Sequence, residues 1–175
     1  MADFRKKIIL TVLCTLLGLI IYLSFKLRND EEKEILKNNY SVIGVISNVG
    51  MKTMDVVYTI NNQTYRYTCN KPYSGITSGE EFYTLAGKSD LSRAIVYYSK
   101  PVIDTIKYKF AIVSPLDIDK LFIDDSEIAF SYEVGNKEYD RIQKYDDGKR
   151  PGNVKKLKVI YRIDKPEIGY LTEIN

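Results

Sequence analysis

The sequence contains no histidine and no tryptophan, and only two of its 175 residues are cysteines. Cys14 lies inside a long apolar run, whereas Cys69 lies far along the chain. The ligand spacings of structural and catalytic zinc sites are therefore missing. A bilayer around the apolar run would also keep the two thiols too far apart for an intramolecular disulfide. Without histidine, Cys69 lacks the usual base that activates a nucleophilic thiol. We expect no metal, no cofactor and no cysteine-based catalysis.

Basic and acidic residues are nearly balanced, so neither sign of charge is in large excess. The formal net charge is +3, and residues 1–25 contribute +2 of it through one aspartate and three basic residues. Nucleic-acid binding relies on a concentrated basic face, so we expect no nucleic-acid partner. The sequence also lacks a nucleophile elbow, a phosphate-binding loop and a dinucleotide fingerprint. These absences favour a protein that is not an enzyme and has no small-molecule ligand.

The strongest positive feature is an apolar run near the start of the chain. Residues 8–25 carry no charge and would form a helix of about 27 Å, close to the roughly 30 Å hydrocarbon thickness of a bilayer. The run is hydrophobic on all sides and follows the basic stretch Arg5–Lys7, as suits a helix in lipid. We predict a single transmembrane helix at about residues 8–25, with the lipid bilayer as its partner.

The run has three other interpretations. A cleavable signal peptide would have a shorter apolar core and a cleavage site of small residues, whereas the chain continues after Phe25 with KLRNDEEKE. A lipoprotein signal would use Cys14, but Leu13 stands before it where a small residue is expected. A buried helix of a soluble protein is the third alternative, and the basic flank disfavours it.

The orientation is predicted from the lengths of the segments on either side of the helix rather than from their charge. Three basic residues precede it and three follow it within a mixed-charge segment, so counting Lys and Arg does not decide the topology. A short leading tail and a long following domain favour an N-terminus inside. We predict a single-pass protein of the inner (plasma) membrane, with an extracytoplasmic C-terminal domain. Good helix formers in residues 29–39 predict a short helical stalk.

Beyond residue 40, alternating apolar and polar residues between turn signals predict antiparallel β-structure. The 15 tyrosines also favour pleated sheet. The expected strands lie near residues 41–47, 54–60, 63–68, 81–86, 94–99, 107–113, 127–134, 137–143, 156–163 and 167–173. Residues 114–126 are ambiguous, because Ser114 followed by Pro115 is a good helix start. A short helix or a long loop is expected there.

One short segment occurs twice. The sequence YTINNQTY at residues 58–65 returns as YEVGNKEY at residues 132–139. A two-residue turn in the middle of each segment would place its first tyrosine directly opposite its last. Such cross-strand pairs explain the spacing without a ligand. The opposed pairs would be Tyr58 with Tyr65 and Tyr132 with Tyr139.

The same pairing sorts the residues of both hairpins into two faces. The core side is expected to carry Val56, Tyr58, Ile60, Phe130, Tyr132 and Val134. The solvent side is expected to carry Thr59, Thr64, Arg66, Ser131, Glu133, Glu138 and Asp140.

A second echo, AIVYYSKPVI at residues 94–103 and KVIYRIDKPEI at residues 158–168, favours an internal duplication. Its offset is smaller than that of the hairpins, so the second copy would have lost about nine residues in a loop. Chance convergence of hairpin sequences is the alternative. We predict two related small β-sheet or barrel modules in tandem, at residues 40–104 and 105–175. They follow a segment of residues 1–39 that holds the cytoplasmic stub, the transmembrane helix and the stalk.

This layout resembles small membrane-anchored β domains of unknown function found in bacteria, in which a hydrophobic helix precedes a tyrosine-flanked hairpin and a late strand that leads to a proline. The matching residues are Tyr58, Ile60, Asn62, Tyr65, Val96, Tyr98 and Pro101, and again Tyr132, Val134, Asn136, Tyr139, Val159, Tyr161 and Pro166. The chain has Lys100 and Lys165 where that pattern usually has an aspartate. The resemblance implies a fold and a membrane anchor, and no activity.

Several charged groups are candidate sites. The pairs Asp124-Asp125 and Asp146-Asp147 are typical of turns, and their surroundings lack the residue order of a calcium loop. Glu133 and Glu138 would oppose one another, which is unfavourable unless a cation or a partner covers them; a solvated face is the plainer interpretation. A basic run could contact anionic headgroups or an acidic partner, or protect a sheet edge. Its members are Lys144, Lys149, Arg150, Lys155, Lys156 and Lys158. Asn62-Gln63-Thr64 matches a glycosylation acceptor, a triplet that is common by chance.

These features predict a non-enzymatic, membrane-anchored subunit or adaptor of a bacterial envelope complex. Its partner would be a protein in the membrane or the periplasm. The alternative is a membrane-tethered inhibitor or immunity protein, which would use an acidic surface such as Glu133, Glu138 and Asp140.

Overall fold

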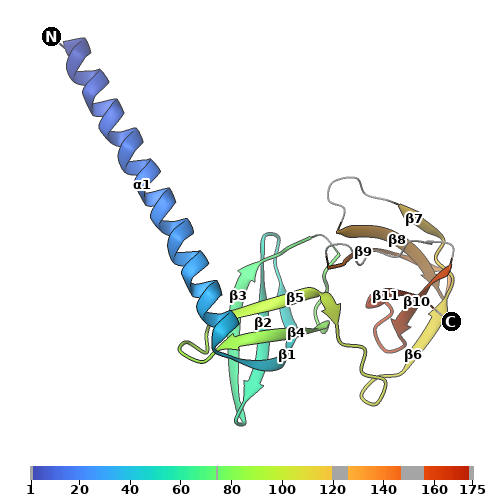
Figure 1. Cartoon of the computed structure of the whole chain (residues 1–175). Helices are drawn as coiled ribbons and strands as arrows, with labels where there is room; N and C mark the ends of the chain where they lie inside the picture. Colours follow the sequence, from blue (N-terminus) through green and yellow to red (C-terminus); the bar gives the residue numbers. More distant parts are fainter. Residues whose placement is uncertain (1, 74, 120–125, 147–155, 174–175) are drawn as a thin grey trace.

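The computed structural model describes residues 2–73, 75–119, 126–146 and 156–173, with side chains from Thr11 onward. Helix α1 (Ala2–Lys37) projects away from the strands, which form three antiparallel sheets (Figure 1). The fold class predicted from the sequence, one N-terminal apolar helix before a mainly β chain, is therefore confirmed. Every expected strand is present, and a further short strand, β7 (Asp117–Asp119), lies inside the ambiguous segment.

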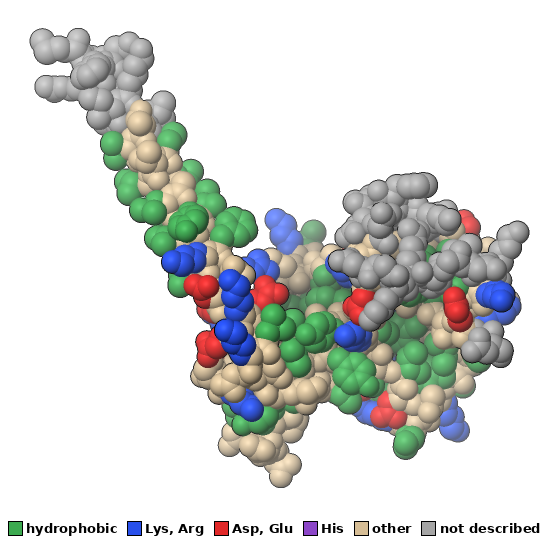
Figure 2. Space-filling model, viewed as in Figure 1, with side chains coloured by type: hydrophobic (Ala, Val, Ile, Leu, Met, Phe, Trp, Pro, Cys, Tyr) green, Lys and Arg blue, Asp and Glu red, His purple; other side chains and the backbone are tan. Residues whose placement is uncertain are grey.

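Helix α1 continues without a break from the apolar run into the predicted stalk. By length and composition its segment Thr11–Lys37 could cross a membrane, a test that a signal sequence also passes, and its apolar part is not buried against the sheets. Figure 2 shows apolar side chains along the described upper part of the helix and charged side chains near its lower end. The last turns pack on the first sheet, where Ile35 is buried and its carbonyl accepts a hydrogen bond from Asn39 Nδ2 at 2.8 Å. This bond satisfies one of the carbonyls left open at a helix end.

The first β unit is a five-stranded sheet. Its strands are β1 (Asn39–Val49), β2 (Thr53–Ile60), β3 (Gln63–Asn70), β4 (Glu81–Gly87) and β5 (Ala94–Pro101). The spatial order is β3-β2-β1-β4-β5, so the first four strands form a Greek key. The second half of β1 pairs with β2, and its first half pairs with β4. The sheet therefore has two outer strands, β3 and β5.

Gly44 allows β1 to pair with both β2 and β4. A Cβ atom at this position would lie 2.5 Å from Thr84 Oγ1 and 2.7 Å from Val56 Cγ1. Both neighbours are fully buried, so neither has room to move. Only glycine lets β1 run straight through this part of the core.

The second β unit contains the two smaller sheets. Its strands are β6 (Phe110–Val113), β7, β8 (Glu127–Val134), β9 (Lys137–Lys144), β10 (Leu157–Arg162) and β11 (Gly169–Glu173). The sheets have the orders β11-β10-β6 and β7-β8-β9. If β6 and β7 are taken as two pieces of one strand, the order is that of the first β unit. The break between them contains Pro115, which has no N–H to donate to a sheet.

The two units also repeat individual hydrogen bonds. Tyr58 Oη donates to the carbonyl of Leu91, in the turn between β4 and β5. Tyr132 Oη donates to the carbonyl of Pro166, in the turn between β10 and β11. The two turns, residues 88–93 and 163–168, are equally long and are closed by equivalent main-chain bonds. In topology β8 and β9 correspond to β2 and β3, while β10 and β11 correspond to β4 and β5.

This correspondence corrects the second echo. The echoed segments contain β5, an outer strand, and β10, which lies between β6 and β11. They are not equivalent, and the inferred loss of nine residues is wrong. The shared pattern of an apolar strand that leads to Lys-Pro therefore reflects similar strand composition rather than a common position in the repeat.

Both hairpins have the predicted register. Tyr58 pairs with Tyr65 and Tyr132 with Tyr139, and the paired rings stack with centroids 6.3 Å and 5.6 Å apart. The turn residues have positive φ: 51° at Asn61, 64° at Asn62, 58° at Gly135 and 63° at Asn136. These are the values that a two-residue hairpin turn of this kind needs.

The faces agree with the prediction at all but one position. Val56, Tyr58, Ile60, Phe130 and Tyr132 are buried, and Val134 is half-buried. Ser131, expected on the solvent side, is only 8% exposed. The cause is β7, which pairs with β8 and was not predicted: Leu116 N donates to the Ser131 carbonyl at 2.9 Å. Residues 117–119 thus form a strand rather than a helix, and residues 120–125 lie outside the described residues.

Candidate functional site

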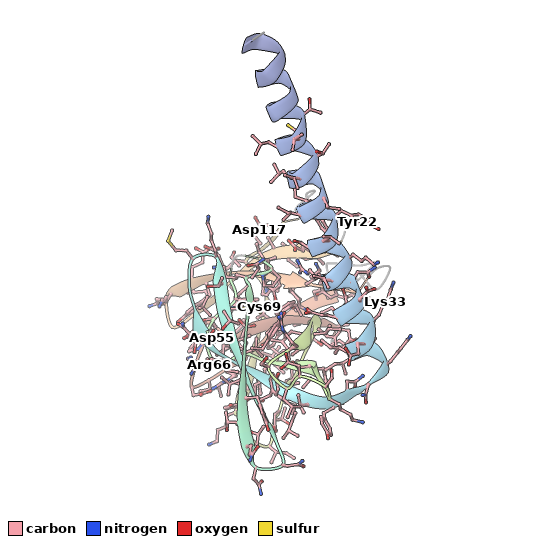
Figure 3. The ribbon with its side chains drawn as sticks, turned by 90° about the vertical axis from the view of Figure 1, so that its left-hand side faces the viewer. Tyr22, Lys33, Asp55, Arg66, Cys69 and Asp117 are labelled. Atoms are coloured by element: carbon pink, nitrogen blue, oxygen red, sulfur yellow. The ribbon has the colours of Figure 1, made fainter. Side chains whose placement is uncertain are left out.

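A groove of about 690 Å³ lies between the two outer strands of the first β unit, and the lower part of α1 forms its third wall. We call it the seam groove. Its wall residues include Arg28 and Glu31 from α1, Tyr67 and Cys69 from β3, and Val96 and Tyr98 from β5. Figure 3 labels Cys69 among the strands, just above Asp55 and Arg66, and labels Lys33 on the helix. The groove begins at the level of Ser24, at the end of the apolar run.

The contact between Cys69 and Tyr98 crosses the groove from β3 to β5. Cys69 Sγ lies 3.3 Å from Tyr98 Oη. Burial raises the pKa of the Cys69 thiol, and burial also raises the pKa of the Tyr98 hydroxyl. Both groups are therefore uncharged at neutral pH. Cys69 is a half-buried packing residue rather than a thiolate.

Charges at the rim of the seam groove neutralise one another. Arg93 Nη1 lies 3.6 Å from Glu31 Oε2, and Arg93 Nε lies 3.8 Å from Asp90 Oδ2. The guanidinium group thus lies between two carboxylates. A neutral floor and a balanced rim favour an uncharged polar or apolar ligand over an anion.

The outward face of the first sheet exposes apolar side chains. Ile43 and Tyr83 are cross-strand partners on β1 and β4, and they are 45% and 50% exposed. Ile106, in the segment that links the two units, is 99% exposed. Clusters of exposed apolar residues are typical of protein interfaces.

The two β units are joined through a buried ion pair. Arg141 on β9 donates from Nη2 to Glu80 Oε2 at 2.8 Å, and from Nη1 to the Gly75 carbonyl. Tyr170 Oη on β11 donates to the same glutamate oxygen at 3.2 Å. The segment before β4 is therefore held by the second β unit, which fixes how the units sit together.

The acidic residues singled out in the sequence do lie together. Glu133 pairs directly with Glu138, and the row Asp117, Ser131, Asp140 runs beside them across β7, β8 and β9. The four carboxylates are exposed. We call Asp117, Glu133, Glu138 and Asp140 the acidic patch. Among the described residues, no group of three or more possible ligands is arranged to hold a metal ion.

The other charged candidates are dispersed. Asp146 accepts a hydrogen bond from Ser99 Oγ and lies 3.8 Å from Lys100 Nζ, so it links β5 to the end of β9. Residues Asp124, Asp125, Asp147, Lys149, Arg150 and Lys155 lie outside the described residues. Lys144 is on the outer strand β9, as edge protection requires.

Lys158 does not fit that interpretation. It is on β10, which is paired on both sides, and it donates to Ser114 Oγ at 2.8 Å. The interpretation that Lys158 protects a sheet edge is therefore wrong. Lys156 is exposed, and Asn62 lies in the exposed first hairpin turn.

Two features of the site were not predicted from the sequence. Glu80 and Arg141 lie in segments with no recognisable motif, and nothing in the sequence indicates that they meet. The seam groove depends on how far two strands separate, which hydrophobic periodicity does not encode. The available signal was the composition of β3, QTYRYTCN, which lacks the lysines and prolines that usually protect an edge.

Comparison with known proteins adds no family to this description. No protein-family model matches the chain, and neither a curated protein nor a solved structure matches it significantly.

Proposed function

We propose that this chain is a non-enzymatic, membrane-anchored subunit or adaptor of a bacterial envelope complex. The apolar part of α1 would stay in the inner membrane with the N-terminus inside, and the two β units would lie outside the cytoplasm. The partner would be a protein in the membrane or the periplasm. The likeness to small membrane-anchored β domains, drawn from short sequence segments, belongs to the same proposal.

The observation that carries the proposal is the direct attachment of the helix to the first β unit. No linker separates α1 from β1, because Asn38 N donates to the Glu34 carbonyl and Lys88 N to the Asn38 carbonyl. Buried Ile35 packs against Gly87, where an added Cβ would lie 3.1 Å from Ile35 Cγ1. A protein that only needed to be tethered would tolerate a flexible linker. Fixed attachment supports a role in which the β units meet a partner at a set height above the membrane.

Copurification tests this proposal. The full-length chain, tagged at its C-terminus, is purified from native membranes in a mild detergent. We expect a membrane or periplasmic protein to copurify in constant proportion. A second variant with Ile43→Lys and Tyr83→Lys asks whether the exposed sheet face contributes. Recovery of the isolated chain alone, across growth conditions, would count against an adaptor.

The acidic patch favours a second candidate, a membrane-tethered inhibitor or immunity protein. Like charges placed directly opposite one another destabilise a sheet, so the pair Glu133 and Glu138 is explained if a basic partner covers it. Deleting the gene should then sensitise cells to a neighbouring strain. Restoring it as the Glu133→Lys, Glu138→Lys variant should fail to protect them.

A further inference from the structure

The repeated β units differ at the seam between their outer strands. In the second β unit, Gln143 on β9 reaches across to β11. Its Oε1 accepts from Leu171 N at 2.7 Å, and its Nε2 donates to the Leu171 carbonyl at 3.4 Å. Gln143 and Leu171 are 8% and 5% exposed. A side-chain amide thus makes the two hydrogen bonds that the peptide group of a neighbouring strand would make, and it closes the second seam.

The equivalent positions of the first β unit are Cys69 and Val96. Cys69 pairs with Met54 as Gln143 pairs with Ile128, and Val96 pairs with Thr84 as Leu171 pairs with Val159. A thiol replaces the amide, and it contacts the Tyr98 hydroxyl rather than the main chain. Among the described residues no strand pairing joins β3 to β5. By equivalence with Leu171, the N–H and carbonyl of Val96 face the seam groove.

We propose that the seam groove takes up an extended segment of a partner polypeptide, which lies between β3 and β5 and pairs with their main chains. The proposal rests on the adaptor function and names the kind of partner. Addition of a strand to a free sheet edge is an established mode of peptide recognition. The second unit shows which chemistry fits such a seam, because an amide closes it.

Three features of the groove agree with this occupant. Its volume of about 690 Å³ lies within the range of roughly 300 to 1,000 Å³ that ligand pockets have. The walls offer Tyr67, Val96 and Tyr98 to alternate side chains. Two arginines, Arg28 and Arg93, and two glutamates, Glu31 and Glu32, line the groove, so its lining carries no net charge and suits a neutral main chain better than a lipid phosphate.

The position of the groove restricts which part of a partner protein could reach it. Residues Ser24–Ile35 of α1 supply one wall, so the groove would open at the membrane surface if the apolar part of the helix is embedded. The segment is then one that leaves the membrane next to a transmembrane helix of the partner. We infer a juxtamembrane strand of a second membrane protein.

Photo-crosslinking in native membranes tests the proposal. A benzophenone amino acid is placed in the full-length chain at Thr68 or at Ile95, which line the groove on β3 and β5. Ile142, the counterpart of Thr68 on β9, is the matched control position. We expect adducts from Thr68 and Ile95 that map to one contiguous segment of one partner, and no such adduct from Ile142. Adducts of lipid mass, adducts to a second copy of this chain, or adducts to unrelated segments would overturn the proposal.

A variant that closes the seam groove provides a second test of the proposal. Cys69→Gln copies Gln143 and should lower the yield of the Thr68 adduct at least tenfold, whereas Cys69→Ser, which adds no amide, should leave it unchanged. If Cys69→Gln does not fold, as judged by circular dichroism, Val96→Pro removes the N–H that faces the groove and serves instead. A partner that copurifies equally with wild type and with the closed variant refutes the strand site but leaves the adaptor function standing. Absence of any partner with wild type refutes both.

Discussion

Arg141 and Glu80 form an ion pair across the two β units, with Arg141 Nη2 2.8 Å from Glu80 Oε2 and with only 4% and 1% of the two residues exposed. Glu80 Oε1 also accepts from Thr77 N at 2.7 Å. The carboxylate raises the pKa of the Arg141 guanidinium against the opposing effect of burial. The pair is therefore charged, desolvated and almost fully hydrogen-bonded.

Removing one charge of this pair should be costly. Glu80→Gln keeps the shape of the side chain but leaves the guanidinium group buried without a counter-charge, and we expect a loss of about 3 to 5 kcal/mol in the free energy of unfolding. Arg66→Ala is the control, because the Arg66–Asp55 pair is 3.7 Å apart and its arginine is exposed; it should cost less than about 1 kcal/mol. Denaturant unfolding of the full-length chain in micelles, followed by tyrosine fluorescence, measures both. Equal effects of the two changes would contradict a structural role for the pair.

Alkaline pH should destabilise the fold through buried tyrosines. Burial, and then the charge of Asp90, raises the pKa of Tyr58 to about 12. An unfolded tyrosine ionises near pH 10, so the unfolded chain loses this proton first and stability falls as the pH rises from about 10 to about 12. Tyrosinate absorbance should show a late-titrating group that disappears in Tyr58→Phe. Titration of every tyrosine near pH 10 in the folded chain would be inconsistent with this burial.

Gly44 should tolerate no side chain. Gly44→Val places methyl groups against Thr84 and Val56, and overpacking of a closed core costs about 1 to 3 kcal/mol. A shift in the denaturation midpoint of the full-length chain reports it. A midpoint equal to that of the wild type would mean that β1 does not cross the core as described.

The hairpin turns should discriminate between glycine and β-branched residues. Asn62 and Asn136 have positive φ, and a β-branched residue in this region costs roughly 1 to 2 kcal/mol. We expect Asn62→Val and Asn136→Val to lower the free energy of unfolding by that amount, while glycine at either position is neutral or stabilising. Thr59→Val, on the exposed strand beside the first turn, is the matched control and should change little.

Local features of the fold were predictable because they repeat at short range. Alternation set the strands, and the turn dipeptides fixed the register that brings Tyr58 opposite Tyr65. Strand β7 was missed because it is only three residues long, which is too short for an alternating pattern to be recognised. The similarity of the two Lys-Pro segments, residues 94–103 and 158–168, led to a wrong alignment of the repeats. An outer strand and a central strand have a similar composition here, so composition did not distinguish them.

The candidate site was not predictable for a different reason. The seam groove depends on a difference between Cys69 and Gln143 that has meaning only once the two units are superimposed in topology. The Glu80–Arg141 pair joins segments 61 positions apart in the sequence. Neither relationship has a local pattern, so both required the arrangement of the strands in space.

One labelling experiment tests whether helix α1 anchors the chain in the membrane with the β units outside the cytoplasm. Met51 is 96% exposed in the first β unit, so a cysteine introduced there, in a chain that also carries Cys14→Ser, can be labelled with a membrane-impermeant maleimide on intact spheroplasts. We predict labelling without lysis, on a chain of full-length mass that stays in the membrane after an alkaline wash. Labelling only after lysis, or a labelled chain that lacks the first 25 or so residues, would contradict it.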